Sequence, residues 1–143
     1  MSRIQAWVIH ISTALVGGTG IVYGVMRYLL KPVDEFAAVN HPLQPMVQHT
    51  HVLVAPLLVL MLGHAWYHHA WVYWTRKLTE GRSTGFIMFL ATMPMIFSGS
   101  LIQVSVSQSW RMVWVVVHVA ASLLWVATYA MHGWIHVKVK LHR

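Results

Sequence analysis

Histidine is the residue type whose number and placement in this sequence could do chemistry. Eleven histidines occur among 143 residues, and nine of them lie in or beside long apolar stretches. Ionisable side chains are expensive inside a lipid bilayer, so each of these is a candidate functional residue. The chain has no cysteine, which leaves histidine as its strongest ligand for a transition metal. The nine histidines are His10, His49, His51, His64, His68, His69, His118, His132 and His136.

His118 and His132 form the sharpest pattern, because they are fourteen positions apart in one apolar stretch. At about 100° per residue their directions differ by about 40°, so they lie on one helix face, roughly 21 Å apart along the axis. That distance suits two haems stacked one in each leaflet of a membrane. Trp125 lies midway on the same face, while Ser122 and Gly133 are small neighbours that would let a macrocycle approach.

Four stretches are long and apolar enough to position these side chains across a bilayer, which needs roughly 20 mostly apolar residues per helix. With 57% hydrophobic and 9% charged residues, the chain cannot cover a water-facing surface, which excludes a soluble protein. We therefore predict an all-α integral membrane four-helix bundle that forms one domain over residues 1–143. The helices are predicted at about residues 4–30, 48–74, 85–106 and 112–137.

The predicted connections carry most of the charges. Three prolines favour an irregular segment over residues 31–47, residues 75–84 form a polar, basic loop, and residues 107–111 form a tight turn. The first apolar run is too long for a signal peptide and shows no small-residue cleavage site, so we expect an uncleaved span.

Basic residues are distributed unevenly between the two sides of the predicted bundle. Seven share the side of both termini and three lie on the other, which predicts both termini in the cytoplasm of a bacterial inner membrane. The net charge of +7 thus reflects topology and not a nucleic-acid partner. The seven are Arg3, Arg76, Lys77, Arg82, Lys138, Lys140 and Arg143, and the three are Arg27, Lys31 and Arg111.

Each haem needs a second axial ligand from another helix at a matching depth. By depth, we predict that His10 pairs with His132 near the cytoplasmic face and that His51 pairs with His118 near the opposite face. Helix one supports this choice, because two glycines follow its histidine at intervals of seven residues and could leave room for a ring. Close packing of helices is the competing explanation for these glycines, Gly17 and Gly24.

The second predicted helix offers competing ligands for the inner haem. His64, His68 or His69 could replace the histidine of helix one, and residues 64–68 weakly resemble residues 132–136. His64 lies thirteen positions after His51, which corresponds to a rotation of about 140° in a regular helix. Pro56 lies between them and can change that phase.

The order of the predicted ligands resembles that in the di-haem cytochrome b subunits of hydrogenases and formate dehydrogenases, and in the related bacterial b561 cytochromes. Those four-helix families bind haem through one histidine in helix one, one in helix two and two in helix four. The positions that match are His10, His51, His118 and His132. The chain departs from the families at Ile11, where tryptophan is usual, and Thr19 and Gly20 come sooner than expected. Residues 48–53 and 94–99 are also similar to small membrane proteins associated with multihaem c-type cytochromes.

The resemblance implies two b-type haems with two histidine ligands each. Such iron has no open coordination position and can only cycle between its ferrous and ferric states. We therefore expect a non-catalytic electron-transfer subunit that connects the quinone pool to a redox partner, such as a c-type cytochrome or a larger catalytic subunit. The rival is a haem-free membrane subunit or a histidine-based metal or proton transporter. A transporter is disfavoured because Asp34, Glu35 and Glu80 all lie outside the predicted spans.

The remaining candidates have simpler explanations. His49 and His51 form a His-x-His pair that could instead bind zinc or copper, although no third ligand is obvious beyond His41. His41 and His142 are otherwise expected to be solvated. Several tryptophans are predicted to form an interfacial belt. These are Trp66, Trp71, Trp74, Trp110, Trp114 and Trp134.

Overall fold

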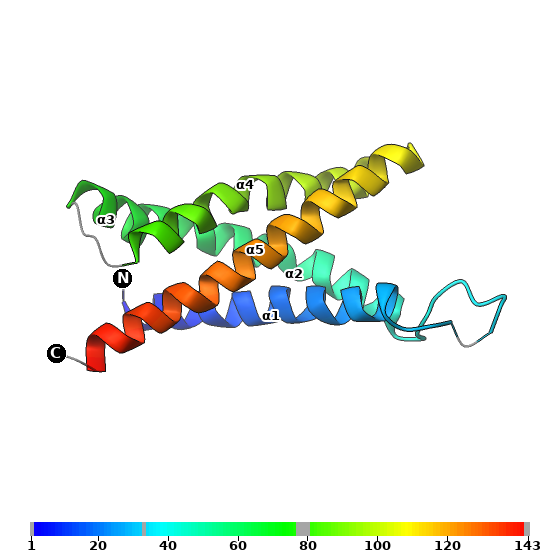
Figure 1. Cartoon of the computed structure of the whole chain (residues 1–143), viewed down its shortest axis with the longest axis horizontal. Coiled ribbons are helices and arrows are strands. Elements are labelled where there is room, and N and C mark those ends of the chain that lie inside the picture. Colours follow the sequence, from blue (N-terminus) through cyan, green and yellow to red (C-terminus); the bar gives the residue numbers. More distant parts are fainter. Residues whose placement is uncertain (1, 33, 77–80, 142–143) are drawn as a thin grey trace. The chain divides into compact units, whose positions relative to one another are not determined.

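The structure is a computed structural model that describes residues 2–32, 34–76 and 81–141, with the side chains of the last helix described as far as Ile135. The regular structure of this part of the chain is helical throughout (Figure 1). Four helical stretches within it are long and apolar enough to cross a membrane. The prediction of an all-α fold with four spans is therefore confirmed.

The chain divides into two compact units, Met1–His69 and Ala70–Arg143. In the first unit, α1 (Arg3–Tyr28) packs against α2 (Gln44–Ala65), and the two helices run antiparallel (Figure 1). A capping box starts α1, because Ser2 Oγ accepts from the backbone of Gln5 and the Gln5 side chain accepts from the backbone of Ser2. At the other end of the α1–α2 pair, the side-chain amide of Asn40 donates to the backbone oxygen of Arg27 at 2.8 Å.

The second span begins earlier than predicted and changes its winding. Helix α2 starts at Gln44 rather than residue 48, since Pro45 lies in the first turn, where a missing N–H leaves no helical bond unmade. A π-helical turn, η1 (Trp66–Ala70), follows α2, and the short helix α3 (Trp71–Thr75) follows η1. The apolar stretch therefore continues from Gln44 to Thr75.

In the second unit, α4 (Arg82–Val104) packs against α5 (Gln108–Leu141) (Figure 1). Residues 108–111, which were predicted to belong to a turn, are the first turn of α5. Trp125 anchors the interface between these helices with only 2% of its surface exposed. Its indole N–H donates to the hydroxyl of Thr92 at 3.1 Å, and its ring stacks on Tyr129. The core of this unit therefore lies along the α4–α5 contact.

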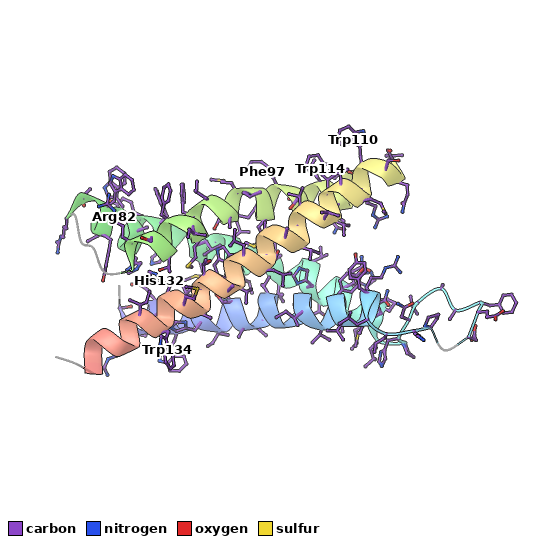
Figure 2. The ribbon with its side chains drawn as sticks, in the orientation of Figure 1. Arg82, Phe97, Trp110, Trp114, His132 and Trp134 are labelled. Carbon is purple, nitrogen blue, oxygen red and sulfur yellow. The ribbon has the colours of Figure 1, made fainter. Side chains whose placement is uncertain are left out.

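Large apolar side chains cover the outer surfaces, as expected for helices that face lipid. Phe97 on α4 is 63% exposed, and Trp110 and Trp114 stack on each other in the first turns of α5 (Figure 2). Trp134 is exposed near the other end of that helix (Figure 2). The cytoplasmic location of both termini stays a prediction. Of the residues used for it, the side chains of Lys77, Lys138, Lys140 and Arg143 lie outside the described part of the chain.

Candidate histidine ligand sites

His118 is held by two groups of the helix that packs against it. Its Nδ1 atom lies 2.9 Å from the backbone oxygen of Met95 and 3.3 Å from the hydroxyl of Ser98, both on α4. A backbone oxygen can only accept, so Nδ1 carries the proton. Ser98 is 1% exposed, and its hydroxyl donates back to the carbonyl of Pro94. The ring of His118 is therefore fixed from the neighbouring helix.

His51 has the same surroundings in the first unit. Its Nδ1 atom lies 3.0 Å from the backbone oxygen of Val16 and 3.2 Å from the hydroxyl of Thr19, both on α1. The Thr19 hydroxyl donates to the carbonyl of Leu15 at 2.7 Å. The proton of His51 is thus on Nδ1, as in His118.

His132, labelled on α5 in Figure 2, is held by a buried threonine. Its Nδ1 atom lies 2.9 Å from the hydroxyl of Thr84, which is 7% exposed. That hydroxyl has a single proton, which it donates to the backbone oxygen of Gly81 at 3.0 Å. With that proton donated to Gly81, the threonine oxygen is left to accept from Nδ1 of His132, the arrangement that matches the other two histidines.

A glycine follows each of these hydroxyls and lets the imidazole lie close to the helix. A Cβ atom added to Gly20 would lie 2.9 Å from Cε1 of His51, and one added to Gly99 would lie 3.1 Å from Cε1 of His118. At Gly85 the distance to Cε1 of His132 would be 3.6 Å, an ordinary contact. A side chain at Gly20 would force a shift, one at Gly99 would require the ring to move by a few tenths of an ångström, and one at Gly85 fits.

We call each arrangement an imidazole socket: a backbone oxygen, a serine or threonine three residues later, and the glycine that follows. The backbone oxygen contacts the imidazole at His51 and His118, whereas at His132 it accepts from the threonine hydroxyl. Among the described residues, sockets form at three histidines. With its proton on Nδ1, a neutral imidazole has its lone pair on Nε2, the atom that commonly binds metals, and the Nδ1 bond fixes the ring orientation. The sockets are Val16, Thr19 and Gly20 for His51; Met95, Ser98 and Gly99 for His118; and Gly81, Thr84 and Gly85 for His132.

The second unit brings its predicted residues together along one interface. His118, Trp125 and His132 all contact α4, in agreement with their predicted common face of α5. Ser122 is half-buried on the same helix. A Cβ added to Gly133 would meet nothing within 4 Å, so the space beside this residue is open.

The candidates on α1 lie differently. His10 is on an exposed part of the helix, where its ring lies edge-on to Trp7 at a centroid distance of 6.2 Å. Gly17 is half-buried, and a Cβ at Gly24 would meet nothing within 4 Å. The predicted pairs, His10 with His132 and His51 with His118, each join residues of different units and stay predictions.

The histidines at the end of α2 form their own group. The rings of His64 and His68 lie 4.4 Å apart between centroids, and His69 is half-buried in the π-helical turn. The Nε2 atom of His64 is buried and has no hydrogen-bond partner in the described part of the chain. His49 is exposed at the start of the same span. The side chains of His136 and His142 lie outside the described residues.

The sockets were missed from the sequence, although a signal for them was present. Each is marked by a hydroxyl residue directly followed by glycine. Two of these pairs, at Thr84 and Ser98, have the same spacing in the sequence as the two histidines that they hold. No group of three or more histidine or carboxylate side chains gathers to hold a metal ion among the described residues.

No protein-family model matches this chain, and neither a curated protein nor a solved structure is significantly similar to it.

Proposed function

We propose that this protein binds b-type haem through its socket histidines and carries electrons in a bacterial inner membrane as a non-catalytic subunit. The observation that carries the proposal is the shared state of His51, His118 and His132. Each has its Nδ1 atom bonded to the neighbouring helix, to a backbone oxygen at the first two and to a hydroxyl at the third. A proton on Nδ1 puts the lone pair on Nε2, the atom that would bind the iron.

The donor set fits haem. A porphyrin supplies four equatorial ligands to its iron, so the protein has to supply only one or two, and single histidines about four turns apart on α5 meet that need. When bound, the haem would supply reversible one-electron chemistry between ferrous and ferric iron. The buried, unpartnered Nε2 of His64 is a further nitrogen donor among the described residues.

The chain's own residues would orient the ligands and separate them. The sockets prevent rotation of each ring, and the Trp125 to Thr92 bond holds α4 and α5 in register between the two sockets of the second unit. Two haems, with a quinone and a c-type cytochrome or larger redox subunit as partners, complete the proposal by analogy with the cytochromes that the ligand order resembles.

The proposal is tested by purifying the protein in detergent from cells supplied with haem. We expect a pyridine haemochrome assay to report two haems b per chain and the dithionite-reduced minus oxidised spectrum to show a low-spin b-type signal. His51→Ala, His118→Ala and His132→Ala should each lose haem. The matched control is His49→Ala, which removes an exposed histidine two residues from a socket histidine. Absence of haem b from the wild-type protein would refute the proposal.

A haem-free protein would still be informative. Metal analysis by mass spectrometry would then show whether zinc or copper copurifies and whether His51→Ala removes it. That result would favour the histidine-based metal-binding alternative over electron transfer.

A further inference from the structure

The two units repeat one arrangement. In each, one helix of the packed pair (α1 or α4) supplies a socket. The other (α2 or α5) supplies a histidine, which we call the first socket histidine. These are His51 in one unit and His118 in the other. The distances agree closely, at 3.0 and 2.9 Å to the backbone oxygen and 3.2 and 3.3 Å to the hydroxyl.

The repeat continues at the next pair of facing positions along both helices, which we call a layer. In the second unit, Trp125 lies seven residues after the first socket histidine and donates to Thr92, six residues before the socket hydroxyl. In the first unit, Leu58 lies seven residues after His51, and Thr13 lies six residues before Thr19. Both are buried, at 4% and 8% exposure. The Thr13 hydroxyl has no hydrogen-bond partner among the described residues, which fits the replacement of an indole donor by leucine.

The next layer of the second unit contains the second ligand of α5. His132 lies fourteen positions after the first socket histidine, and Thr84 lies as many positions before the first socket hydroxyl. In the first unit, fourteen positions after His51 along α2 is Ala65. Fourteen positions before Thr19 along α1 is Gln5. The histidine next to this position is His64.

The first unit has no socket at this layer. Gln5 and Ala6 stand where the second unit has threonine and glycine, and the Gln5 side chain is bonded to the backbone of Ser2. The ring of His64 packs instead against His68, with 4.4 Å between the centroids. His64 is thus one residue, or about 100° in a regular helix, away from the position equivalent to His132, and the ring packing against it comes from the same stretch of helix.

The state of the His64 ring indicates a ligand. Its Nε2 atom is buried without a hydrogen-bond partner in the described part of the chain, and burial of such a nitrogen is unfavourable unless something binds it. The π-helical turn Trp66–Ala70 begins two residues later, and such turns occur frequently at functional sites. Iron at Nε2 would satisfy this atom.

We propose that His64 is the fourth haem-ligating histidine, one residue before the position of the first unit that corresponds to His132 in the second. The inference rests on the proposed function and deepens it, because it replaces His10 with His64 in the ligand set. It also assigns His68 as a residue that positions the His64 ring through packing.

Three single variants test the assignment: His64→Ala, His10→Ala and His68→Ala. Haem b per chain and the low-spin fraction are measured by pyridine haemochrome assay and electron paramagnetic resonance. We expect His64→Ala to fall from two haems to one, or to convert one haem to a high-spin form. His10→Ala should keep two low-spin haems, and His68→Ala should keep both with an altered signal from one.

A second variant separates ligation from folding. In His64→Gly, added imidazole should restore the low-spin signal, whereas a histidine with a purely structural role would show no such rescue. Two low-spin haems in His64→Ala would overturn the assignment while leaving haem binding intact, as would loss of one haem in His10→Ala alone. A wild-type protein without haem would overturn the proposed function itself, so the two failures are distinguishable.

Discussion

The Nδ1 atom of His118 donates to the backbone oxygen of Met95 at 2.9 Å, one turn before the serine that also contacts the ring. This backbone partner cannot be removed by a side-chain substitution. The hydroxyl and the glycine of a socket can be removed by substitution. The three sockets differ in how much each histidine depends on the hydroxyl and on the glycine.

Substitution of the socket glycines by alanine should have graded effects. Gly20→Ala places a Cβ 2.9 Å from the His51 ring, and Gly99→Ala places one 3.1 Å from the His118 ring, so either the imidazole or the helix has to move. Such overpacking typically destabilises by about 1–3 kcal/mol. Gly85→Ala, at 3.6 Å, is the matched control and should keep its haem. Haem content and low-spin signals of the three variants measure the effect, and equal losses in all three would contradict the geometry.

Removal of a socket hydroxyl should matter more at Thr84 than at Ser98. In Ser98→Ala, His118 keeps its bond to the backbone oxygen of Met95, whereas Thr84→Val removes the hydroxyl that is bonded to Nδ1 of His132. Loss of an outer-shell partner lowers metal affinity by about 10- to 100-fold and makes the imidazole less basic. We therefore expect Thr84→Val to bind one haem more weakly and to raise its midpoint potential. Redox titration checks this, and a larger shift in Ser98→Ala would argue against it.

Two equivalent threonines should respond oppositely to valine. Thr92→Val removes the acceptor for the Trp125 indole, and hydrogen bonds between membrane helices contribute on average about 0.6 kcal/mol and at most about 1.7 kcal/mol. Thr13→Val removes a buried hydroxyl that has no partner in the described residues, so it should be neutral or stabilising. Unfolding free energies measured by denaturant titration in mixed micelles compare the two. Equal destabilisation would show that the Thr13 hydroxyl is bonded.

Membrane orientation can be tested with single cysteines, because the native chain has none. Phe36, in the connection between α1 and α2, is 95% exposed, and Ser83, in the first turn of α4, is also exposed. The excess of basic residues predicts that Phe36→Cys is labelled by an impermeant maleimide in intact cells and that Ser83→Cys is labelled only after permeabilisation. The cysteine-free chain controls for background. The reverse pattern would place both termini outside the cytoplasm.

The spans were predictable because apolar length alone determines what can cross a bilayer. The ends of the spans were less predictable. The prolines of residues 31–47 predict an irregular segment, whereas Pro45 lies in the first turn of α2, where a helix tolerates proline. The π-helical turn at Trp66–Ala70 has no composition that distinguishes it from the α-helix on either side. Local winding of this kind is decided by packing.

The sequence singled out three histidines and missed the residues that surround them. Burial cost, depth and spacing indicated His51, His118 and His132, whose role as ligands stays a prediction. Their sockets depend on which helices pack together, and α4, which has no histidine, was given no part in the site. It supplies two of the three sockets in the described residues.

The antiparallel register of α4 and α5 ties the lengths of two distant segments to each other. Residues 84–98 and residues 118–132 are equally long, and both sockets of this unit form only while the lengths agree. A one-residue insertion in either segment would turn every later side chain by about 100° and separate one histidine from its hydroxyl. Homologues that keep both sites should therefore conserve these two lengths or change them together.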